Sequence, residues 1–402
     1  MAAAEASINE LSFPLTRTAA LQRLREFVPD AGASYARLRN FDHGPGGHVN
    51  VSRLSAALRR RLIGEDEVVR AVLAMHGPTT SEKFISEVFW RTYWKGWLEQ
   101  RPTVWTGYLQ SLDRAREHLD ADTARARRFA DACAGHTGID CFDAWAAELD
   151  ATGYLHNWAR MQFASIWVFT LGLPWELGAA FMLDRLIDAD PASNTLSWRW
   201  VAGLHTAGKA YLADAERIRT MTSGRFAPRR LAQHASITAD TVSVPPASQP
   251  RISQTPDNTS PTLLLVTIED LSLETLPAFD TLNVKAIAFL SEDDAADRTS
   301  LEDAFARLGL RWPDAVVLGA LGPTAFHDAK ASGCRQVATG FAPVGPTADR
   351  LQRLQRQALD EGLSFAENLR PWDRRAWPHC RKGFFGLKER IPELLKAAGH
   401  QA

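Results

Sequence analysis

The stretch TGYLHNWARM, residues 152–161, contains the pattern on which the fold assignment turns. Asn157, Arg160 and Met161 follow one another at i, i+3 and i+4, so a helix would carry all three on one stripe. An amide, a guanidinium and a thioether on one stripe are suited to the wall of a polar pocket. An arginine that pairs with an acid across a helix interface is the commoner explanation. The stretch therefore predicts a helix, and its role stays open at this point.

Helical periodicity extends far to either side of this stretch. Apolar residues recur with a period near 3.6, and the alternation typical of strands is scarce. The predicted helices cover residues 17–27, 51–62, 65–75, 81–99, 123–134, 141–151, 155–171 and 175–186. Residues 1–232 are therefore expected to form a mostly α-helical domain.

Two acids and an amide follow these helices in DADPASN, residues 188–194, which leads to Trp198 and Trp200. Asx turns that cap the next helix explain the motif by itself. The same groups also suit a polar site beside the two indoles.

Glu87, Trp90, Arg91 and Trp94 share one helix face further upstream. Buried charges need partners, so this face is either part of a site or half solvated.

The segment NVSRLS, residues 50–55, follows a Gly/Pro-rich loop and opens a predicted helix. Its hydroxyls and free N–H groups are suited to binding a phosphate, and equally to plain helix capping.

The pattern changes after residue 232. Residues 233–261 are rich in Ser, Thr and Pro and are expected to form a flexible linker. Short apolar runs then alternate with helical stretches, which predicts a smaller α/β domain with a parallel sheet over residues 262–402. The expected strands are 262–268, 284–290, 315–319 and 336–340, and the expected helices are 300–308 and 347–361. Neither GxGxxG nor GxxxxGK[ST] occurs there, so no nucleotide site follows from motifs.

Composition narrows the class of protein. The four cysteines have no CxxC spacing, which argues against zinc, a disulfide framework or a four-cysteine cluster, so no metal is expected. No run of 18 apolar residues and no secretory signal is present, and we expect a cytoplasmic protein without a membrane contact. The net charge of −1 means that a nucleic-acid partner would need a local basic face. Candidates for such a face are Arg53, Arg59, Arg60, Arg61, Lys95, Arg225, Arg229 and Arg230, and a basic cluster such as 59–61 is more often simply a solvated helix face.

Together these motifs resemble, in order, those of the FAD-binding domain of the photolyase/cryptochrome family. The family's Thr-Ser-Arg-Leu-Ser-Pro segment corresponds to 51–56 and its Glu-x-x-Trp-Arg helix to 87–91. Its Thr-Gly-Trp-x-His-Asn-x-x-Arg-Met stretch corresponds to 152–161, and its Asp-Gly-Asp-x-Ala-x-Asn loop with Trp-x-Trp to 188–200. The resemblance spans about residues 14–228, over half the chain.

The resemblance implies a role for each matched position. Residues expected to hold FAD are Tyr35, Ser52, Arg53, Leu54, Ser55, Arg91, Arg160, Asp188, Asp190 and Asn194. Among them, Arg160 and Asp188 are expected to form a salt bridge beside the flavin ring. Residues expected to contact a flipped-out lesion are Glu87, Trp90, Asn157, Met161 and Trp200. Trp198 and then Trp175 are expected to pass electrons to the flavin.

The implied activity is blue-light-driven repair of DNA by a carbon–carbon lyase that transfers an electron from reduced FAD to the lesion. The family's (6-4) enzymes carry histidines where this chain has Asn157 and Met161, so the residues here resemble those of cyclobutane pyrimidine dimer photolyases. UV-damaged DNA is the implied partner. The alternative is a cryptochrome-like photoreceptor that keeps FAD and signals through a protein partner.

Several positions depart from the family. Val51 replaces a hydroxyl residue and Trp158 replaces a basic one. The outer relay tryptophan is expected near Asp122, and none is present there. Trp94, Trp97, Trp105, Trp145 and Trp167 are the candidate substitutes. Photolyases also begin with an α/β antenna domain, whereas here the α/β region comes last. Residues 262–279 weakly resemble the opening of that domain, which suggests a permuted antenna-like module, and an unrelated α/β module stays open. The second chromophore is unknown.

Overall fold

The structure, a computed structural model, describes residues 13–206, 209–235 and 244–400. They form two compact units, each built from separated stretches of the chain. Among the described residues, unit 1 holds residue 13 with 33–53, 103–206, 209–235 and 244–246, and unit 2 holds 14–32, 54–102 and 247–400. These units are defined by which residues pack together. The domain boundaries at residues 232 and 262 that the sequence suggests stay a prediction.

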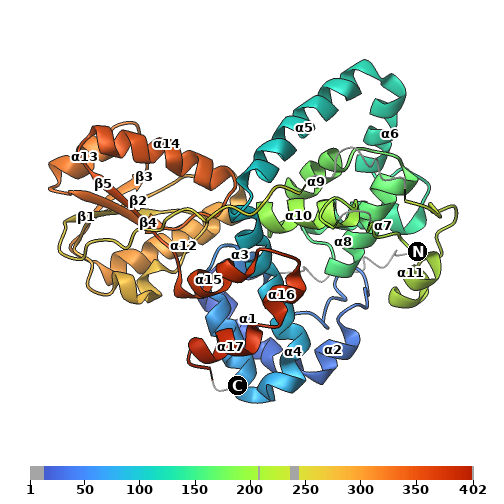
Figure 1. Ribbon diagram of the computed structural model, residues 1–402, viewed down its shortest axis with the longest axis horizontal. Coiled ribbons are helices and arrows are strands. Elements are labelled where there is room, and N and C mark those ends of the chain that lie inside the picture. The colour runs from blue at the N-terminus through green and yellow to red at the C-terminus, as the bar shows by residue number, and fades with distance from the viewer. Residues whose placement is uncertain (1–12, 207–208, 236–243, 401–402) are drawn as a thin grey trace, which may run out of the picture. The chain divides into compact units, whose positions relative to one another are not determined.

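Unit 1 is helical. Its elements are α2 (Ala33–Leu38), α5 (Pro102–Ala121), α6 (Thr123–Cys133), α7 (Asp140–Thr152), α8 (Asn157–Ser165), a π-helical turn η2 (Ile166–Thr170), α9 (Trp175–Leu183), α10 (Pro191–Val201) and α11 (Ala215–Met221). Helices α8, α9 and α10 pack on one another (Figure 1). Helix α10 starts where Asp190 accepts a hydrogen bond from the backbone N–H of Ser193, and Pro191 supplies a preset first turn.

Unit 2 combines helices from the first hundred residues with a parallel sheet. The first part contains α1 (Arg17–Phe27), η1 (Val28–Asp30), α3 (Ser55–Arg59) and α4 (Glu65–Glu99). Inside α4, Gly77 has φ 67° and ψ 169°, and Pro78 follows it, so two helical segments meet there at a kink. This break lies between the two helices predicted at 65–75 and 81–99. The helix predicted over 51–62 is shorter, because residues 51–54 have no helical backbone.

The sheet of unit 2 has the order β3-β2-β1-β4-β5, and every neighbouring pair is parallel. Its strands are β1 (Thr262–Val266), β2 (Val284–Phe289), β3 (Val316–Ala320), β4 (Gln336–Gly340) and β5 (Ser364–Asn368). The predicted parallel sheet is thus confirmed, with β5 as a strand that the sequence pattern missed. This order is that of a doubly wound, Rossmann-like sheet.

Helices cover both faces of the sheet (Figure 1). Helices α13 (Ala325–Ala331) and α14 (Pro346–Asp360) share one apolar core with β1, β2, β4 and β5. Helix α12 (Ala295–Arg311) packs on β2 and on the short turn η4 (Leu273–Thr275), which is followed by η5 (Pro277–Phe279). The fold class is therefore a mainly helical region with a smaller α/β region, as expected.

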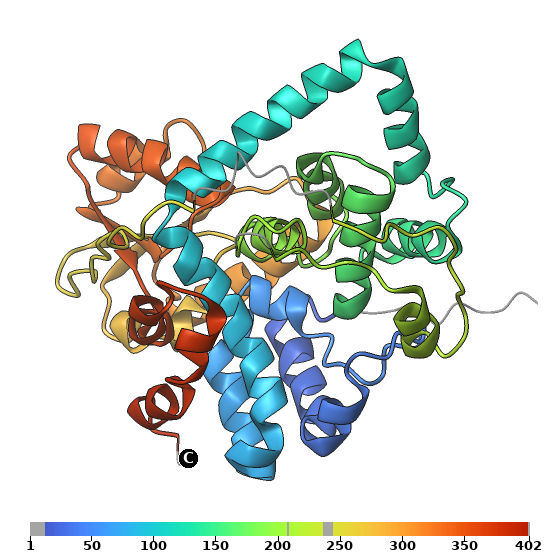
Figure 2. The same ribbon diagram turned by 45° about the vertical axis from the view of Figure 1, so that its right-hand side comes forward.

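The C-terminal residues return to the helices of unit 2. They form α15 (Pro371–Ala376), η6 (Trp377–His379), α16 (Phe384–Lys388) and α17 (Ile391–Ala397). Figure 2 shows these red helices alongside the light-blue α4, in agreement with the packing of α15, η6 and α16 on α4.

Part of the expected linker is attached to unit 2. The backbone N–H of Ser248 donates to the carbonyl of Gln100, and the guanidinium of Arg251 pairs with Glu99 at 2.7 Å. Residues 236–243 of this segment lie outside the described residues.

Across the part of the chain that the structure describes, no helix is both long and apolar enough to cross a membrane.

Candidate functional site

The residues predicted to form the site occur in both units, and each group is described within its own unit. Unit 1 carries Tyr35, Ser52, Arg53, Asn157, Arg160, Met161, Trp175, Asp188, Asp190, Asn194, Trp198 and Trp200. Unit 2 carries Leu54, Ser55, Glu87, Trp90 and Arg91.

Arg160 and Asp188 form a two-pronged ion pair in unit 1. Nη1 lies 3.2 Å from Oδ1 and Nη2 lies 3.1 Å from Oδ2, and Nε donates to the carbonyl of Leu155 at 2.8 Å. The Asp188 side chain is almost fully buried, while that of Arg160 is 21% exposed. This fork geometry fixes the start of α8 to the loop before α10. The pairing implied by the resemblance is therefore present in the structure.

The stripe predicted on α8 is partly accessible. Asn157 is exposed, and Arg160 and Met161 are half-buried. Trp158, where the resemblance expects a basic residue, is instead buried and meets the ring of Trp145 edge to face at 6.3 Å. It serves as core in this chain and offers no contact to a nucleic-acid backbone.

Helix α10 holds Asn194 and Trp198 in the interior of unit 1. The Asn194 amide donates to the carbonyl of Ala179 at 2.8 Å, which leaves its oxygen for another partner. Trp198 meets Trp167 edge to face at 6.1 Å. Gly178 makes this contact possible, since a Cβ there would lie 2.4 Å from the Trp198 ring.

Two tyrosines that the sequence analysis did not single out lie beside predicted aromatic residues. Tyr211 lies 5.4 Å from the ring of Trp200, and its hydroxyl accepts a hydrogen bond from Gln162. Tyr108 lies 5.4 Å from Trp175 and 5.5 Å from Trp105. The sequence signal for the cluster of Trp105, Tyr108 and Trp175 is the i, i+3 spacing of Trp105 and Tyr108, which places both rings on one face of α5.

The segment 52–55 has the features of a ligand cradle. Arg53 adopts a left-handed backbone with φ 56°, which is uncommon for a residue with a side chain. The buried Nε of Arg53 and Oγ of Ser55 have no hydrogen-bond partner among the described residues. Unsatisfied buried donors call for a partner such as a phosphate. Leu54 and Tyr35 are buried.

The loop before this segment is anchored by buried polar groups. The Asp42 carboxylate accepts hydrogen bonds from the Gly44 backbone and from Trp145 Nε1 at 2.8 Å, and forms an ion pair with Arg225 at 3.0 Å. His48 Nε2 lies 2.6 Å from Glu148 Oε1. Burial favours a raised pKa for Asp42, but these hydrogen bonds and the charge of Arg225 bring its pKa below the ordinary value.

Asp42, His48 and Glu148 offer ligand atoms within 4.8 Å of one another, the spacing of a metal site. Because the Asp42 carboxylate already accepts two hydrogen bonds and pairs with the Arg225 guanidinium, we interpret the group as an anchor of the loop on α7.

In unit 2, one face of α4 carries the predicted set. Glu87, Trp90 and Arg91 are half-buried, whereas Trp94 is 7% exposed. Arg91 donates to the carbonyl of Ser55 at 3.5 Å, so this face is joined to the end of the cradle segment that belongs to unit 2. Trp90 is also stacked on Phe384, a contact that no local sequence pattern signals.

Four of the cations predicted for a DNA-binding face are buried in unit 2, and that prediction is wrong for them. Arg59 pairs with Glu269 at 2.9 Å, Arg60 with Asp297 at 2.6 Å, and Arg61 with Asp373. Lys95 lies 3.9 Å from Glu269. A charged side chain is buried only when it has a partner of opposite charge. Here each acidic partner lies more than 170 residues away in the chain, so the local sequence could not indicate the burial. Arg225 is engaged by Asp42, whereas Arg229 and Arg230 are exposed.

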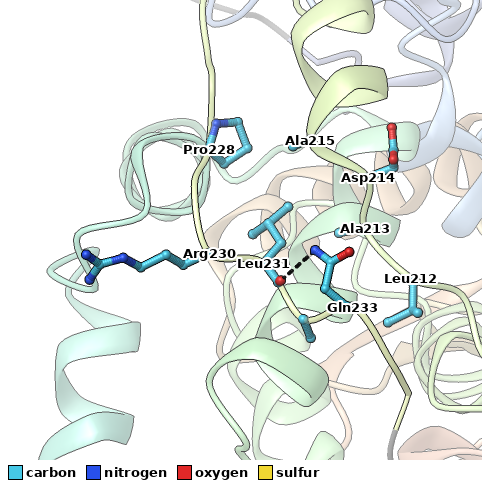
Figure 3. Close-up of a pocket in the computed structure, with 9 residues that line it drawn as sticks. Leu212, Ala213, Asp214, Ala215, Pro228, Arg230, Leu231 and Gln233 are labelled. Carbon is cyan, nitrogen blue, oxygen red and sulfur yellow. Dashed lines mark hydrogen bonds between the residues drawn. The ribbon is translucent and has the colours of Figure 1, made fainter.

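A pocket of unit 1 contains none of the residues predicted to contact FAD or the lesion, although Arg230, a candidate for the basic face, lines it (Figure 3). It is lined by residues 212–215, by Pro228 and by residues 230–233, and the Gln233 side chain donates to the Leu231 carbonyl within the second of these segments. Asp214 is the N-cap of α11 and accepts from the Arg217 backbone. The pocket thus lies between two neighbouring segments of the chain, and its lining residues do not form a recognisable catalytic or ligand-binding group.

Comparisons with known proteins bear on the helical region. Residues 84–235 match the family described as the FAD binding domain of DNA photolyase. A deoxyribodipyrimidine photo-lyase of Streptomyces griseus is 36% identical over 156 residues, which cover 39% of this chain and 32% of that protein. The deoxyribodipyrimidine photo-lyase of Escherichia coli (strain K12) is 27% identical over 217 residues, which cover 51% of this chain and 43% of that protein. A cryptochrome DASH of Natronomonas pharaonis is 38% identical over 112 residues, covering 25% and 23%.

The expected resemblance to the photolyase/cryptochrome family is confirmed by these matches. The alignments cover less than half the length of each of these relatives. The family match begins at residue 84, after the cradle segment. The predicted role of Tyr35 and of residues 52–55 in FAD binding is therefore supported only by the sequence motif and the local geometry.

Proposed function

We propose that this chain, whose residues 84–235 match the FAD-binding domain of DNA photolyases, is a FAD-dependent enzyme that repairs cyclobutane pyrimidine dimers in DNA under blue light. The curated relatives in this region are mostly named deoxyribodipyrimidine photo-lyase, which supports repair of a dipyrimidine lesion. The main structural support is the half-buried face of α4 that carries Glu87, Trp90 and Arg91.

The residues present fit FAD. The unsatisfied Arg53 Nε and Ser55 Oγ would bind its phosphates, and the Arg160–Asp188 pair and the Asn194 amide oxygen would lie along its ring system. Bound FAD would supply the light absorption and the electron. The protein would supply orientation and a site that excludes water.

The role of the lesion-facing residues follows from their chemistry. A lesion must leave the base stack, which costs a few kcal/mol and less where pairing is already distorted. Stacking on Trp90 and Trp200 would offset this by ~1–3 kcal/mol per base. The Glu87 carboxyl would hydrogen-bond the bases, and Asn157 and Met161 would complete the contact.

A second candidate is a photoreceptor without repair, since Trp158 and the buried Arg59, Arg60 and Arg61 remove four positively charged contacts expected for a DNA backbone. The similarity to a cryptochrome DASH also supports this second candidate.

The test is light-dependent repair by the purified, photoreduced protein with a thymine-dimer oligonucleotide. We expect dimers to be converted to thymines in the light only. Glu87→Ala should lower repair by about tenfold or more, as loss of a charged hydrogen bond predicts. Glu117→Ala, which removes an exposed acid of α5, should leave repair unchanged. Bound flavin without repair of the dimer or of (6-4) DNA would favour the photoreceptor.

A further inference from the structure

The C-terminal segment of unit 2 packs along one side of α4. The Trp372 indole donates to Thr92 Oγ1 at 2.9 Å, and the Gln100 amide donates to the Trp377 carbonyl at 2.8 Å. Gly96 allows this approach, because a Cβ there would lie 2.5 Å from the Trp377 ring. Residues 371–388, which we call the C-terminal clasp, thus fix the half of α4 that carries the proposed lesion contacts.

Within the clasp, Phe384 stacks directly on Trp90. The ring centroids are 3.8 Å apart and the planes are inclined by 13°. Phe384 is only 5% exposed, and its position is fixed by the edge of Tyr93, whose hydroxyl donates to the Lys382 carbonyl at 2.8 Å. Phe384 is therefore a packed part of the molecule.

The surroundings of Trp90 restrict how its indole can be used. Phe384 covers one face, Tyr93 meets the ring edge to face at 5.5 Å, and Trp94 lies at 5.1 Å. Trp90 nevertheless remains half-buried and not fully enclosed. A base can stack only on a face that is not already occupied. An aromatic ring whose orientation is fixed in advance also loses less entropy when it binds.

We propose that Phe384 is a positioning residue that holds the Trp90 indole so that its opposite face receives the flipped-out base. This inference rests on the proposed function of Trp90 in lesion binding. It makes the far end of the chain part of the repair site and assigns the C-terminal clasp a role in specificity beyond packing.

The test compares Phe384→Ala with Phe385→Ala, because Phe385 is the neighbouring ring and is 75% exposed. We expect Phe384→Ala to raise the Kd for a thymine-dimer oligonucleotide about three- to tenfold, as loss of an aromatic pair predicts. The quantum yield of repair at saturating oligonucleotide should change less than twofold. Phe384→Tyr keeps the stack and should restore the Kd, and Phe385→Ala should match the wild type.

A second readout does not need activity. In protein labelled with 5-fluorotryptophan, the ¹⁹F resonance assigned through Trp90→Phe should shift in Phe384→Ala and stay in place in Phe385→Ala. Phe384→Leu fills the space without an aromatic face and serves if the alanine variant does not fold.

The outcomes separate the two claims. A wild-type protein that neither binds nor repairs the dimer overturns the proposed function. A wild type that repairs, together with a folded Phe384→Ala or Phe384→Leu variant whose Kd is unchanged, overturns the positioning role alone.

Discussion

At the residue scale, His156 links the helical core to the candidate site. It caps α8, since its Nδ1 accepts the backbone N–H of Trp158 at 3.3 Å, and the stripe with Arg160 begins one residue later. Its ring stacks on that of His48 at 5.6 Å. Burial lowers the pKa of His156 to about 4, with further lowering by His48 and Arg160, against a partial rise from Asp42.

This pKa shift predicts how stability depends on pH. The unfolded chain, in which a histidine has a pKa of about 6.5, binds more protons than the folded chain between pH about 4 and about 6.5. The contribution is therefore complete above pH about 6.5 and is lost as the pH falls, by about 2 kcal/mol at pH about 5. His156→Asn keeps a capping side chain and removes this titration. Urea unfolding at neutral pH and at pH about 5 should show a smaller loss for the variant, and equal losses would contradict the shift.

Local spacing predicted which candidate residues share a helix face, but it could not predict partners that are distant in the sequence. The stripe on α8 and the face on α4 follow from i, i+3, i+4 spacing, and the Arg160–Asp188 pair was expected from the resemblance. Phe384 and Tyr211 carry no such signal, because their contacts with Trp90 and Trp200 form only when the chain has folded. Arg59, Arg60 and Arg61 looked like a solvated or DNA-facing cluster for the same reason.

At the element scale, periodicity identified elements whose apolar pattern was unbroken. Strand β4 has the predicted bounds, and its five residues are all buried. Strand β5 reads SFAEN, and its polar residues hid a strand that is mostly buried. Helix α5 was also missed, because its exposed polar positions outnumber its buried ones. The edge position of β5 in the sheet and the length of α5 depend on tertiary packing, which a short sequence pattern does not encode.

The kink of α4 gives a prediction at this scale. Gly77 occupies a backbone region that is essentially restricted to glycine, and no atom lies within 4 Å of the place where a Cβ would be. Gly77→Ala should therefore lower the free energy of unfolding by ~1–3 kcal/mol through backbone strain alone. Gly107→Ala is the control, since Gly107 lies within α5 with equal space around it, and should raise stability by about 0.5–1 kcal/mol. Urea unfolding of both variants measures this, and a neutral Gly77→Ala would argue against the kink.

At the scale of the whole molecule, buried charges join the beginning of the chain to its end. Arg61 is surrounded by Glu65, Asp270 and Asp373, and all four side chains are at most 1% exposed. The three carboxylates raise the pKa of Arg61 against the effect of burial, so it stays charged. Asp270 follows β1 and also pairs with Arg370 after β5. The carboxyl end of the sheet, where doubly wound folds usually bind ligands, is here occupied by these side chains.

This network predicts that residues 1–232 do not fold as an independent domain, although their helical periodicity predicts one. A fragment that ends at residue 232 would leave Arg59, Arg60, Arg61 and Lys95 without the acids Glu269, Asp270, Asp297 and Asp373. Truncation also removes the residues that bury these cations, so the fragment would lose the ion pairs together with the packing of α15, η6 and α16 on α4, and would expose the surface that they cover. A protein is usually stable by only about 5–15 kcal/mol, so a loss of this extent is expected to unfold the fragment. We therefore expect the fragment to show no cooperative urea transition and to retain no flavin, whereas the full chain shows both. A fragment that unfolds cooperatively with FAD bound would mean that these four cations find solvent or other partners, and that the α/β region is an appendage and not part of the same folding unit.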